Sequence, residues 1–368
     1  MCIYPNGVPS FSPGLDVYVV PLGDPSSLAR RANGNELLDR QSVISIREKY
    51  MPVHYLTEAD VRQILTMDMA IESVEAAFRK LSLDEAVNIP RQRCQTDQVM
   101  LHVLPAAAKT LNALGLKAYT TGKFDAKFHV YLFDPKIGGL IAILEADHMG
   151  AVRTGAASGA ATKKLARKDA TTLGLYGVGK QARTQVEAIC KVRTIAKVHV
   201  FARDAAKRIA FAEEMSKVCG TEVIPVGTPE EAARGMDIIC TATSSREPIL
   251  FGSWLSEGTH LNLVGSNFLG KAEADVEVFK RATLVALDSK DQARAEAGDL
   301  VAAMAEGVLG WGDTYDFAHI LAGRYPGRQT PQDITVFKSL GLGIQDVAVA
   351  AKVFKKAMEL GIGKKILD

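Results

Sequence analysis

The feature that most constrains this chain is a glycine-rich turn between an apolar run and a helical pattern. Residues 171–176 form the apolar run, which leads into Gly177-x-Gly179-x-x-Ala182. A strand, a tight turn and a helix N-terminus in this order can bind the pyrophosphate of a dinucleotide on free backbone N–H groups. Gly177 allows the sharp turn, Gly179 lets a phosphate approach the backbone, and Ala182 keeps the helix close to the strand. An ordinary strand–helix turn is the alternative, but the flanking patterns favour a dinucleotide site.

The segment 171–329 continues the alternation of strands and helices that starts at this turn. Its apolar runs predict strands at 171–176, 197–201, 222–225, 237–242, 259–264 and 283–287. Helical patterns separate these runs, and strands that alternate with helices typically form a parallel sheet. The segment is therefore predicted to be a doubly wound domain.

The rest of the chain predicts a second body of structure and an N-terminal extension. The 368 residues exceed the length of one typical domain, about 100–200 residues. Strands are predicted at 100–104, 116–119, 128–133 and 140–145, a hairpin turn at 134–139, and a helix of small residues at 154–165. After residue 333 the pattern predicts one more strand and a helix at 345–360. Residues 1–50 have no periodic apolar face and are expected to be a poorly ordered, dispensable extension.

Charge and composition exclude several classes of function. The formal net charge of +2 gives no reason to expect nucleic acid or an anionic membrane as a partner. No apolar stretch approaches the ~18–20 residues of a membrane-spanning helix. The five cysteines are scattered and the seven histidines show no metal-ligand spacing, so no metal site is expected. Reduced thiols are typical of the cytoplasm, which is the expected location.

The residues after the second strand of the doubly wound segment bear on which dinucleotide is bound. About 20 residues past the glycines, an acid would bind the ribose 2′-hydroxyl of NAD, whereas an arginine suits the 2′-phosphate of NADP. The chain reads Ala202-Arg203-Asp204 at this point. Arg203 slightly favours NADP, and Asp204 keeps NAD open. Both charges are also ordinary for the solvated start of a helix.

Five segments of the chain resemble the ornithine cyclodeaminase/mu-crystallin family. They are residues 151–170 (AVRTGAASGAATKKLARKDA), 177–185 (GVGKQARTQ), 241–248 (TATSSREP), 258–265 (GTHLNLVG) and 341–348 (GLGIQDVA). The resemblance implies an α/β fold in which a Rossmann-type doubly wound parallel sheet, residues 171–329, is inserted in a discontinuous α+β substrate-binding and dimerisation domain, residues 51–170 and 330–368. It also implies a homodimer and reactions at the α-carbon of amino or imino acids.

Three basic residues match substrate-binding positions of this family. The resemblance implies that Arg91 and Arg153 bind the substrate carboxylate, for which planar guanidinium is a bidentate partner. Lys117 lies inside an apolar strand pattern, and a buried lysine with a shifted pKa suits proton transfer. The family has a lysine here beside the reacting nitrogen, so Lys117 is predicted to be both catalytic and substrate-binding. Surface ion pairs for the arginines and a solvent-reaching ammonium for the lysine are the alternatives.

The glycine turn and the position after the second strand predict Gly177, Gly179 and Arg203 at the cofactor, and the resemblance adds further cofactor-binding residues. Together they are Arg153, Thr154, Gly177, Gly179, Lys180, Gln181, Arg203, Thr241, Thr243, Val264, Gly265, Ser266 and Lys271.

One residue departs from the family pattern. Cyclodeaminases and alanine dehydrogenases of the family have a catalytic aspartate where this chain has Asn267. An amide cannot act as a general base near neutral pH, although it can hydrogen-bond a substrate or the cofactor. The predicted function is therefore an NAD(P)H-dependent reductase of an imino acid, such as a ketimine or Δ1-pyrroline-2-carboxylate, or an amino-acid dehydrogenase. Asn267 is predicted to occupy the catalytic position of this enzyme. The alternatives are a cyclodeaminase-type ammonia lyase with bound NAD and a mu-crystallin-like ligand-binding protein.

Overall fold

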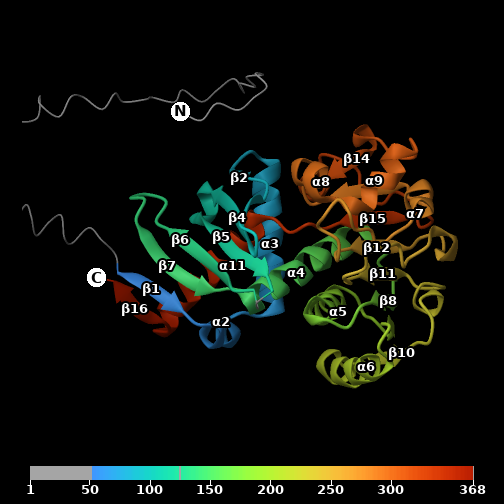
Figure 1. Cartoon of the computed structure of the whole chain (residues 1–368), viewed down its shortest axis with the longest axis horizontal. Coiled ribbons are helices and arrows are strands. Elements are labelled where there is room, and N and C mark those ends of the chain that lie inside the picture. Colours follow the sequence, from blue (N-terminus) through green and yellow to red (C-terminus); the bar gives the residue numbers. More distant parts are fainter. Residues whose placement is uncertain (1–51, 124–125, 368) are drawn as a thin grey trace, which may run out of the picture. The chain divides into compact units, whose positions relative to one another are not determined.

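The computed structural model describes residues 52–123 and 126–367, which form two β-sheets flanked by helices (Figure 1). The predicted extension, residues 1–50, lies outside the described residues. The first sheet is built mainly from the N-terminal third of the chain, and the second from residues 172–338. Helix α4, Asp147–Leu165, follows the last of the first sheet's N-terminal strands and leads into the second sheet.

The first sheet is mixed and has eight strands. Their order is β16-β1-β7-β6-β5-β4-β2, and β3 pairs with β4. The strands are β1 Val53–Leu56, β2 Ala86–Asn88, β3 Gln92–Gln95, β4 Val99–Ala108, β5 Ala113–Gly122, β6 Phe128–Phe133, β7 Leu140–Glu145 and β16 Lys364–Leu367. Neighbours are antiparallel except β1 and β7. The hairpin predicted between 128–133 and 140–145 is present with the predicted bounds.

Helices α2 Glu58–Ile64, α3 Met67–Ser82, α4 and α11 Gly343–Leu360 pack together over one face of this sheet. A capping box formed by Thr57 and Asp60 starts α2. In α3 the residues Ile71, Val74 and Phe78 share one face and are buried, and the Thr66 hydroxyl caps the helix by accepting the Met69 N–H. Side chains on the opposite face of the sheet stay half-exposed, because no described helix covers them.

The second sheet has eight strands, all parallel, in the order β10-β9-β8-β11-β12-β15-β13-β14. They are β8 Thr172–Tyr176, β9 Lys197–Phe201, β10 Glu222–Pro225, β11 Ile238–Thr241, β12 His260–Leu263, β13 Leu284–Leu287, β14 Thr314–Asp316 and β15 Thr335–Lys338. The strand order reverses between β8 and β11, and ligands of doubly wound sheets bind outside the carboxyl ends of the strands at such a point.

Helices lie on both faces of the second sheet, which confirms the predicted Rossmann-type doubly wound fold. They are α5 Lys180–Val192, α6 Ala205–Cys219, α7 Val276–Arg281, α8 Lys290–Glu296, α9 Gly298–Ala305 and α10 Phe317–Leu321. Short 3-10 turns occur at Lys109–Leu111, Glu230–Ala232, Gly252–Trp254 and Trp311–Asp313. Separate apolar cores fill the two sides of the sheet.

Two sequence-based boundaries need correction. Residues 330–368 were expected to belong wholly to the first domain, but β15 lies inside the second sheet, between β12 and β13. Only α11 and β16 return to the first sheet. Helix α4 begins at Asp147 rather than near residue 154, because the Glu58 carboxylate accepts the backbone N–H groups of Asp147 and His148 and so caps the helix from α2.

The small residues of the helix predicted at 154–165 allow α4 to pack closely on α5. A methyl carbon at Gly155 would lie 2.7 Å from the carbonyl carbon of Thr184, and one at Gly159 would lie 3.3 Å from the Ala188 side chain. The Thr184 hydroxyl donates to the Ala151 carbonyl at 2.9 Å. This contact fixes the second turn of α5 relative to the helix that carries Arg153.

Candidate active site

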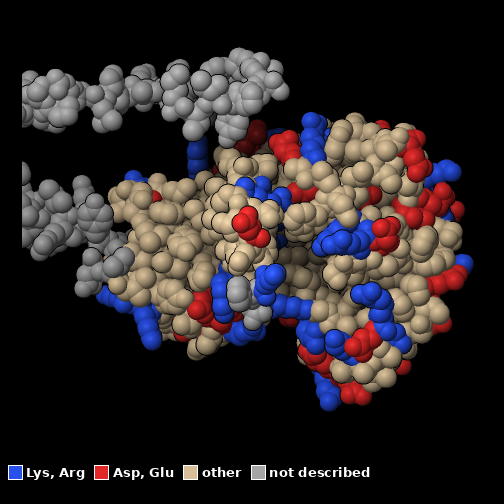
Figure 2. All heavy atoms as spheres, in the orientation of Figure 1, with Lys and Arg blue, Asp and Glu red and all other residues tan. Residues whose placement is uncertain are grey.

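A cavity of about 650 Å³ lies between the two sheets and is lined by residues of both. Basic side chains border a hollow between the two halves of the molecule in Figure 2. The cavity brings together most of the residues predicted from the sequence: Arg91, Lys117, Arg153, Thr154, Lys180, Gln181, Thr243, Val264, Gly265, Asn267 and Lys271. Chain segments that are far apart in the sequence, from Arg91 to Gly341, thus contribute to one site, which the sheet topology makes possible.

Lys117 is buried at the cavity wall on β5, with 3% of its surface exposed. Its ammonium lies 2.9 Å from Asp346 Oδ1 and over the rings of Phe128 and Tyr119, at 5.2 and 5.7 Å from their centroids. Burial lowers the pKa of Lys117 to about 8, and the Asp346 carboxylate opposes this shift. The lysine is therefore poised to hold or release a proton near neutral pH.

Asp346 is the most important site residue that the sequence-based prediction missed. It lies in the first turn of α11, is fully buried, and accepts hydrogen bonds on Oδ1 from both Lys117 and Arg153 Nε, the latter at 3.0 Å. The available signal was an acid between Ile344 and Val347 in an apolar helix, because a buried carboxylate needs a charged partner. The pattern could not identify that partner.

Arg153 is held in place at two of its nitrogens. In addition to the bond from Nε to Asp346, its Nη1 donates to Gln345 Oε1 at 3.0 Å. The structure shows no hydrogen bond from its Nη2 group to another described residue. Arg153 lines the cavity, so this end of the guanidinium is oriented for a ligand while the rest of the side chain is fixed.

Arg91 also reaches the cavity, but protein groups already occupy much of its guanidinium. Its Nη1 lies 2.7 Å from Glu296 Oε2, and its Nη2 donates to the carbonyls of Leu340 and Gly341 at 2.9 and 3.2 Å. Glu296, which ends α8, also pairs with Arg93, whose guanidinium lies 4.8 Å from the Phe268 ring centroid. Glu296 was not predicted, and it joins the substrate-side arginines to the second sheet.

The glycine turn has the predicted geometry. Gly177 follows β8 with a φ of 102°, a conformation that favours glycine, and Gly179 is the N-cap of α5 with no side-chain capping bond. The first turn of α5 therefore offers backbone N–H groups to an anion. Lys180, at the cavity, pairs with Asp147 of α4.

Four other predicted cofactor residues do not line the cavity, and neither does Gly177 itself. Thr241 and Ser266 are fully buried, and their hydroxyls donate to Glu273 Oε2 at 2.8 Å and to the Lys271 carbonyl at 2.6 Å. Arg203 is exposed after β9, and Gly179 lies at the helix start. Asp204, the residue that would favour NAD, is the N-cap of α6, and its carboxylate accepts the Lys207 N–H.

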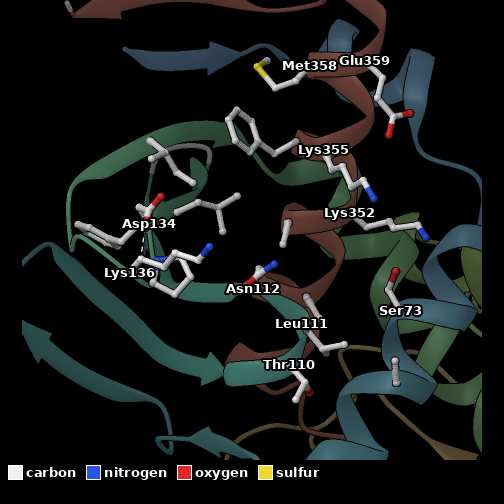
Figure 3. A pocket seen from close by; sticks show the side chains of 18 of the residues that line it. Ser73, Thr110, Leu111, Asn112, Asp134, Lys136, Lys352, Lys355, Met358 and Glu359 are labelled. Atoms are coloured by element: carbon white, nitrogen blue, oxygen red, sulfur yellow. Dashed lines mark hydrogen bonds between the residues drawn. The ribbon is translucent and has the colours of Figure 1, made fainter. Parts of the chain in front are cut away.

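A second cavity, of about 970 Å³, contains none of the predicted site residues. It lies between the β6–β7 hairpin and α11, and Asn112, Asp134 and Lys355 are among its lining residues (Figure 3). Of these two cavities, the one of about 650 Å³ therefore contains the predicted basic residues.

The family model described as "Ornithine cyclodeaminase/mu-crystallin family" matches residues 53–361. The chain belongs to this family. It is 34% identical over 322 residues to an alanine dehydrogenase of Archaeoglobus fulgidus, covering 84% of this chain and 97% of the relative. The structure of Thermococcus litoralis Δ1-pyrroline-2-carboxylate reductase in complex with NADH and L-proline superposes with a TM-score of 0.81 at 36% identity, over 85% of this chain and 100% of that one. An archaeal alanine dehydrogenase dimer with bound NAD gives a TM-score of 0.81 at 33% identity, over 86% and 99% of the two chains.

These relatives of the ornithine cyclodeaminase/mu-crystallin family confirm the predicted family, fold and class of enzyme, an NAD(P)-dependent oxidoreductase of amino or imino acids. The two solved structures contain NADH and NAD, so the preference for NADP is not among the confirmed points. None of the described helices has both the length and the apolarity to span a membrane.

Proposed function

We propose that this protein reduces the C=N bond of an α-imino acid, with NAD(P)H as the hydride donor. The observation that carries the proposal is the buried cluster of Lys117, Asp346 and Arg153 at a cavity whose other wall is formed by the loops after β11 and β12. Such a site combines a carboxylate-binding cation, a proton-holding lysine and the carboxyl edge of a dinucleotide-binding sheet.

The residues of the second sheet fit a dinucleotide. Gly177 turns the chain into α5, whose first-turn N–H groups have no side-chain cap and suit a pyrophosphate. Thr243, Gly265 and Asn267 extend the site along the strand ends toward Lys117. When bound, NAD(P)H supplies a hydride to the imine carbon.

Arg153 binds the substrate carboxylate in this proposal. Its Nε and Nη1 are fixed by Asp346 and Gln345, which leaves Nη2 for a ligand in the cavity. Because these two partners lock the side-chain conformation, little conformational entropy is lost when the carboxylate binds. Arg91 contributes positive charge on the same side, balanced by Glu296.

Lys117 donates the proton that the imine nitrogen needs. A pKa of about 8 keeps the ammonium form predominant at neutral pH while making the proton easier to release than from an exposed lysine. With NAD(P)H bound, this proton from Nζ and a hydride from the cofactor would convert the C=N bond to CH–NH. The neutral amine of Lys117 then regains a proton from water, and the adjacent Asp346 carboxylate stabilises the resulting ammonium.

Three rings beside Lys117 support a substrate with an uncharged side chain. His102, Tyr119 and Phe128 are direct cross-strand partners, with ring centroids 4.3 and 4.8 Å apart. Burial, aided by Arg93 and Arg91, lowers the pKa of His102 to about 4, so the imidazole is neutral. Among the described residues that line the cavity, Asp147 is the one acid, and it pairs with Lys180.

The absence of a carboxylate at position 267 favours reduction over cyclodeamination. Asn267 lines the cavity, where an amide can hydrogen-bond but cannot accept a proton from a substrate amine. A distal ammonium, such as that of ornithine, would also find no unpaired acid among the described lining residues. A preformed imine needs neither group.

We also propose that NADP is accepted in preference to NAD, because Arg203 is exposed after β9 whereas Asp204 is engaged in capping α6.

A homodimer is proposed through the open face of the first sheet. There a cross-strand row of Leu116, Tyr131 and Ile143 stays half-exposed. Such a continuous apolar face is typical of an interface. Tyr131→Glu should shift the mass in light scattering from dimer to monomer, and an unchanged mass would contradict this interface.

The test of the proposed function is a cofactor-oxidation assay at 340 nm with Δ1-pyrroline-2-carboxylate and either NADH or NADPH. We expect net oxidation of the cofactor, and Asn267→Asp should lower turnover while leaving cofactor affinity within about twofold. Ammonia and proline formed from ornithine, without net change in the cofactor, would establish the lyase instead. Tight binding of a ligand with no turnover of any imino or amino acid would indicate that the protein is a ligand-binding protein and not an enzyme.

A further inference from the structure

Three charged side chains lie fully enclosed beneath the loops that follow β11 and β12. They are Glu273, Asp299 in the first turn of α9, and Lys338 at the end of β15, with 0%, 2% and 0% of their surfaces exposed. None of them lines the cavity between the sheets. Burying three ions is costly unless each has charged and hydrogen-bonding partners, so their contacts indicate what they hold.

Glu273 joins the ends of β11 and β12. Its Oε1 accepts the Thr243 N–H and hydroxyl, each at 2.7 Å, and its Oε2 accepts the Gly265 N–H at 2.7 Å and the Thr241 hydroxyl at 2.8 Å. Thr243 and Gly265 both line the cavity. One carboxylate therefore fixes the spacing between the two loops that face Lys117.

Lys338 and Asp299 complete the network from below. The Lys338 ammonium lies 2.8 Å from Asp299 Oδ2 and donates to the Ser266 carbonyl at 2.6 Å. Asp299 Oδ1 in turn accepts the backbone N–H groups of Glu273 and Ala274. The Gly265 N–H thus donates to Glu273, and the Ser266 carbonyl accepts from Lys338.

The packing leaves this backbone little freedom to move. A methyl carbon at Gly265 would lie 2.5 Å from the Thr243 nitrogen, so the two loops are already at closest approach. The Asn267 side chain begins one residue beyond the Lys338 contact, at the cavity. A small displacement of Ser266 would therefore move Asn267 relative to the substrate side of the site.

We propose that Glu273, Asp299 and Lys338 are positioning residues that set the loops contacted by the nicotinamide half of the cofactor. The α5 end of the site, which fits the pyrophosphate, lies outside their hydrogen bonds. Loss of a partner in the network should therefore weaken the nicotinamide half of binding and spare the ADP-ribose half. This inference rests on the proposed dinucleotide site.

The experiment compares the Kd of NADH with that of ADP-ribose, which lacks nicotinamide, in the wild type and in Glu273→Gln. Glutamine keeps the shape of the side chain but replaces one acceptor oxygen with an NH2 group that faces backbone donors. We expect the Kd of NADH to rise about tenfold or more, as for loss of a hydrogen bond to a buried charge, and that of ADP-ribose to stay within about twofold. The deuterium isotope effect on imine reduction should also increase if hydride transfer becomes less well aligned.

Thr241→Val gives a second, milder variant in case Glu273→Gln folds poorly. It removes one hydroxyl that donates to Glu273 and leaves no charge unpaired, and Thr241 does not reach the cavity. We expect a smaller rise in the Kd of NADH, again without change for ADP-ribose. Thr335→Val is the matched control, because this buried threonine of β15 bonds to His260 outside the network.

Equal weakening of both ligands in Glu273→Gln and Thr241→Val, or no change in either, would overturn the positioning role. If the wild type binds neither NADH nor ADP-ribose, the proposed dinucleotide site is what fails. The two failures are therefore distinguishable.

Discussion

Lys117 and Asp346 form a buried ion pair, Nζ to Oδ1 2.9 Å, although 229 positions separate them in the chain. The pair joins the centre of the first sheet to the first turn of α11. Its carboxylate also holds Arg153, so one buried acid orients both the proposed proton donor and the proposed carboxylate ligand. Asp346 thus opposes the lowering of the Lys117 pKa by burial and at the same time orients Arg153.

Replacing Asp346 with Asn should shift the pH profile. Asp346 raises the pKa of Lys117 against the effect of burial, so its removal lowers that pKa below about 8. Since the ammonium form donates the proton, the basic limb of kcat/KM should move to lower pH, by about one unit or more. Asp147→Asn, which removes a half-exposed ion pair at the cavity edge, should leave the limb in place. An unchanged limb in Asp346→Asn would remove Lys117 from the proton-transfer step.

Replacing Arg153 with Lys should weaken binding of the transition state. Lysine keeps the charge but loses the planar fork that holds Asp346 and Gln345 while presenting Nη2 to the cavity. We expect a loss of about 1.5–3 kcal/mol in transition-state stabilisation, measured as the fall in kcat/KM. A melting temperature close to that of the wild type would separate this loss from unfolding. A kcat/KM within twofold of the wild type would exclude Arg153 from carboxylate binding.

Replacing Arg203 with Ala tests the cofactor preference. The exposed guanidinium after β9 is the proposed partner of a 2′-phosphate, so the Kd of NADPH should rise several-fold and that of NADH should change little. Lys207→Ala removes an exposed charge one turn into α6 and serves as the control. If neither affinity changes, or if NADH alone is weakened, the preference for NADP is wrong.

Replacing Gly155 with Ala should destabilise the fold. Alanine favours a helix over glycine by about 1 kcal/mol, but the added carbon would lie 2.7 Å from the carbonyl carbon of Thr184, which is rigid backbone. Overpacking of this kind costs about 1–3 kcal/mol, so the melting temperature should fall by a few degrees. Gly139→Ala, in the β6–β7 turn where no atom lies within 4 Å of the added carbon, is the control for adding a methyl group without overpacking. Equal melting temperatures for the two variants would show that α4 and α5 can separate without cost.

Local patterns in the sequence determined most of the secondary structure and the elements that carry the site. The glycine turn after β8, the β6–β7 hairpin and the buried position of Lys117 follow from backbone geometry and from the alternation of apolar residues. These are short-range effects, because a strand or a glycine turn is specified within about ten residues. The resemblance to the family added the residues that line the opposite wall.

Tertiary structure alone decided the partners of the charged groups. The early start of α4 depends on a carboxylate from α2, and the insertion of β15 into the second sheet depends on pairing with strands about 50–75 residues away. Thr241 and Ser266 were predicted at the cofactor, yet their hydroxyls are engaged by groups beneath the loops. A sequence pattern indicates that a charge is buried, but which opposite charge meets it depends on how distant elements pack, and Asp346 was found only in this way.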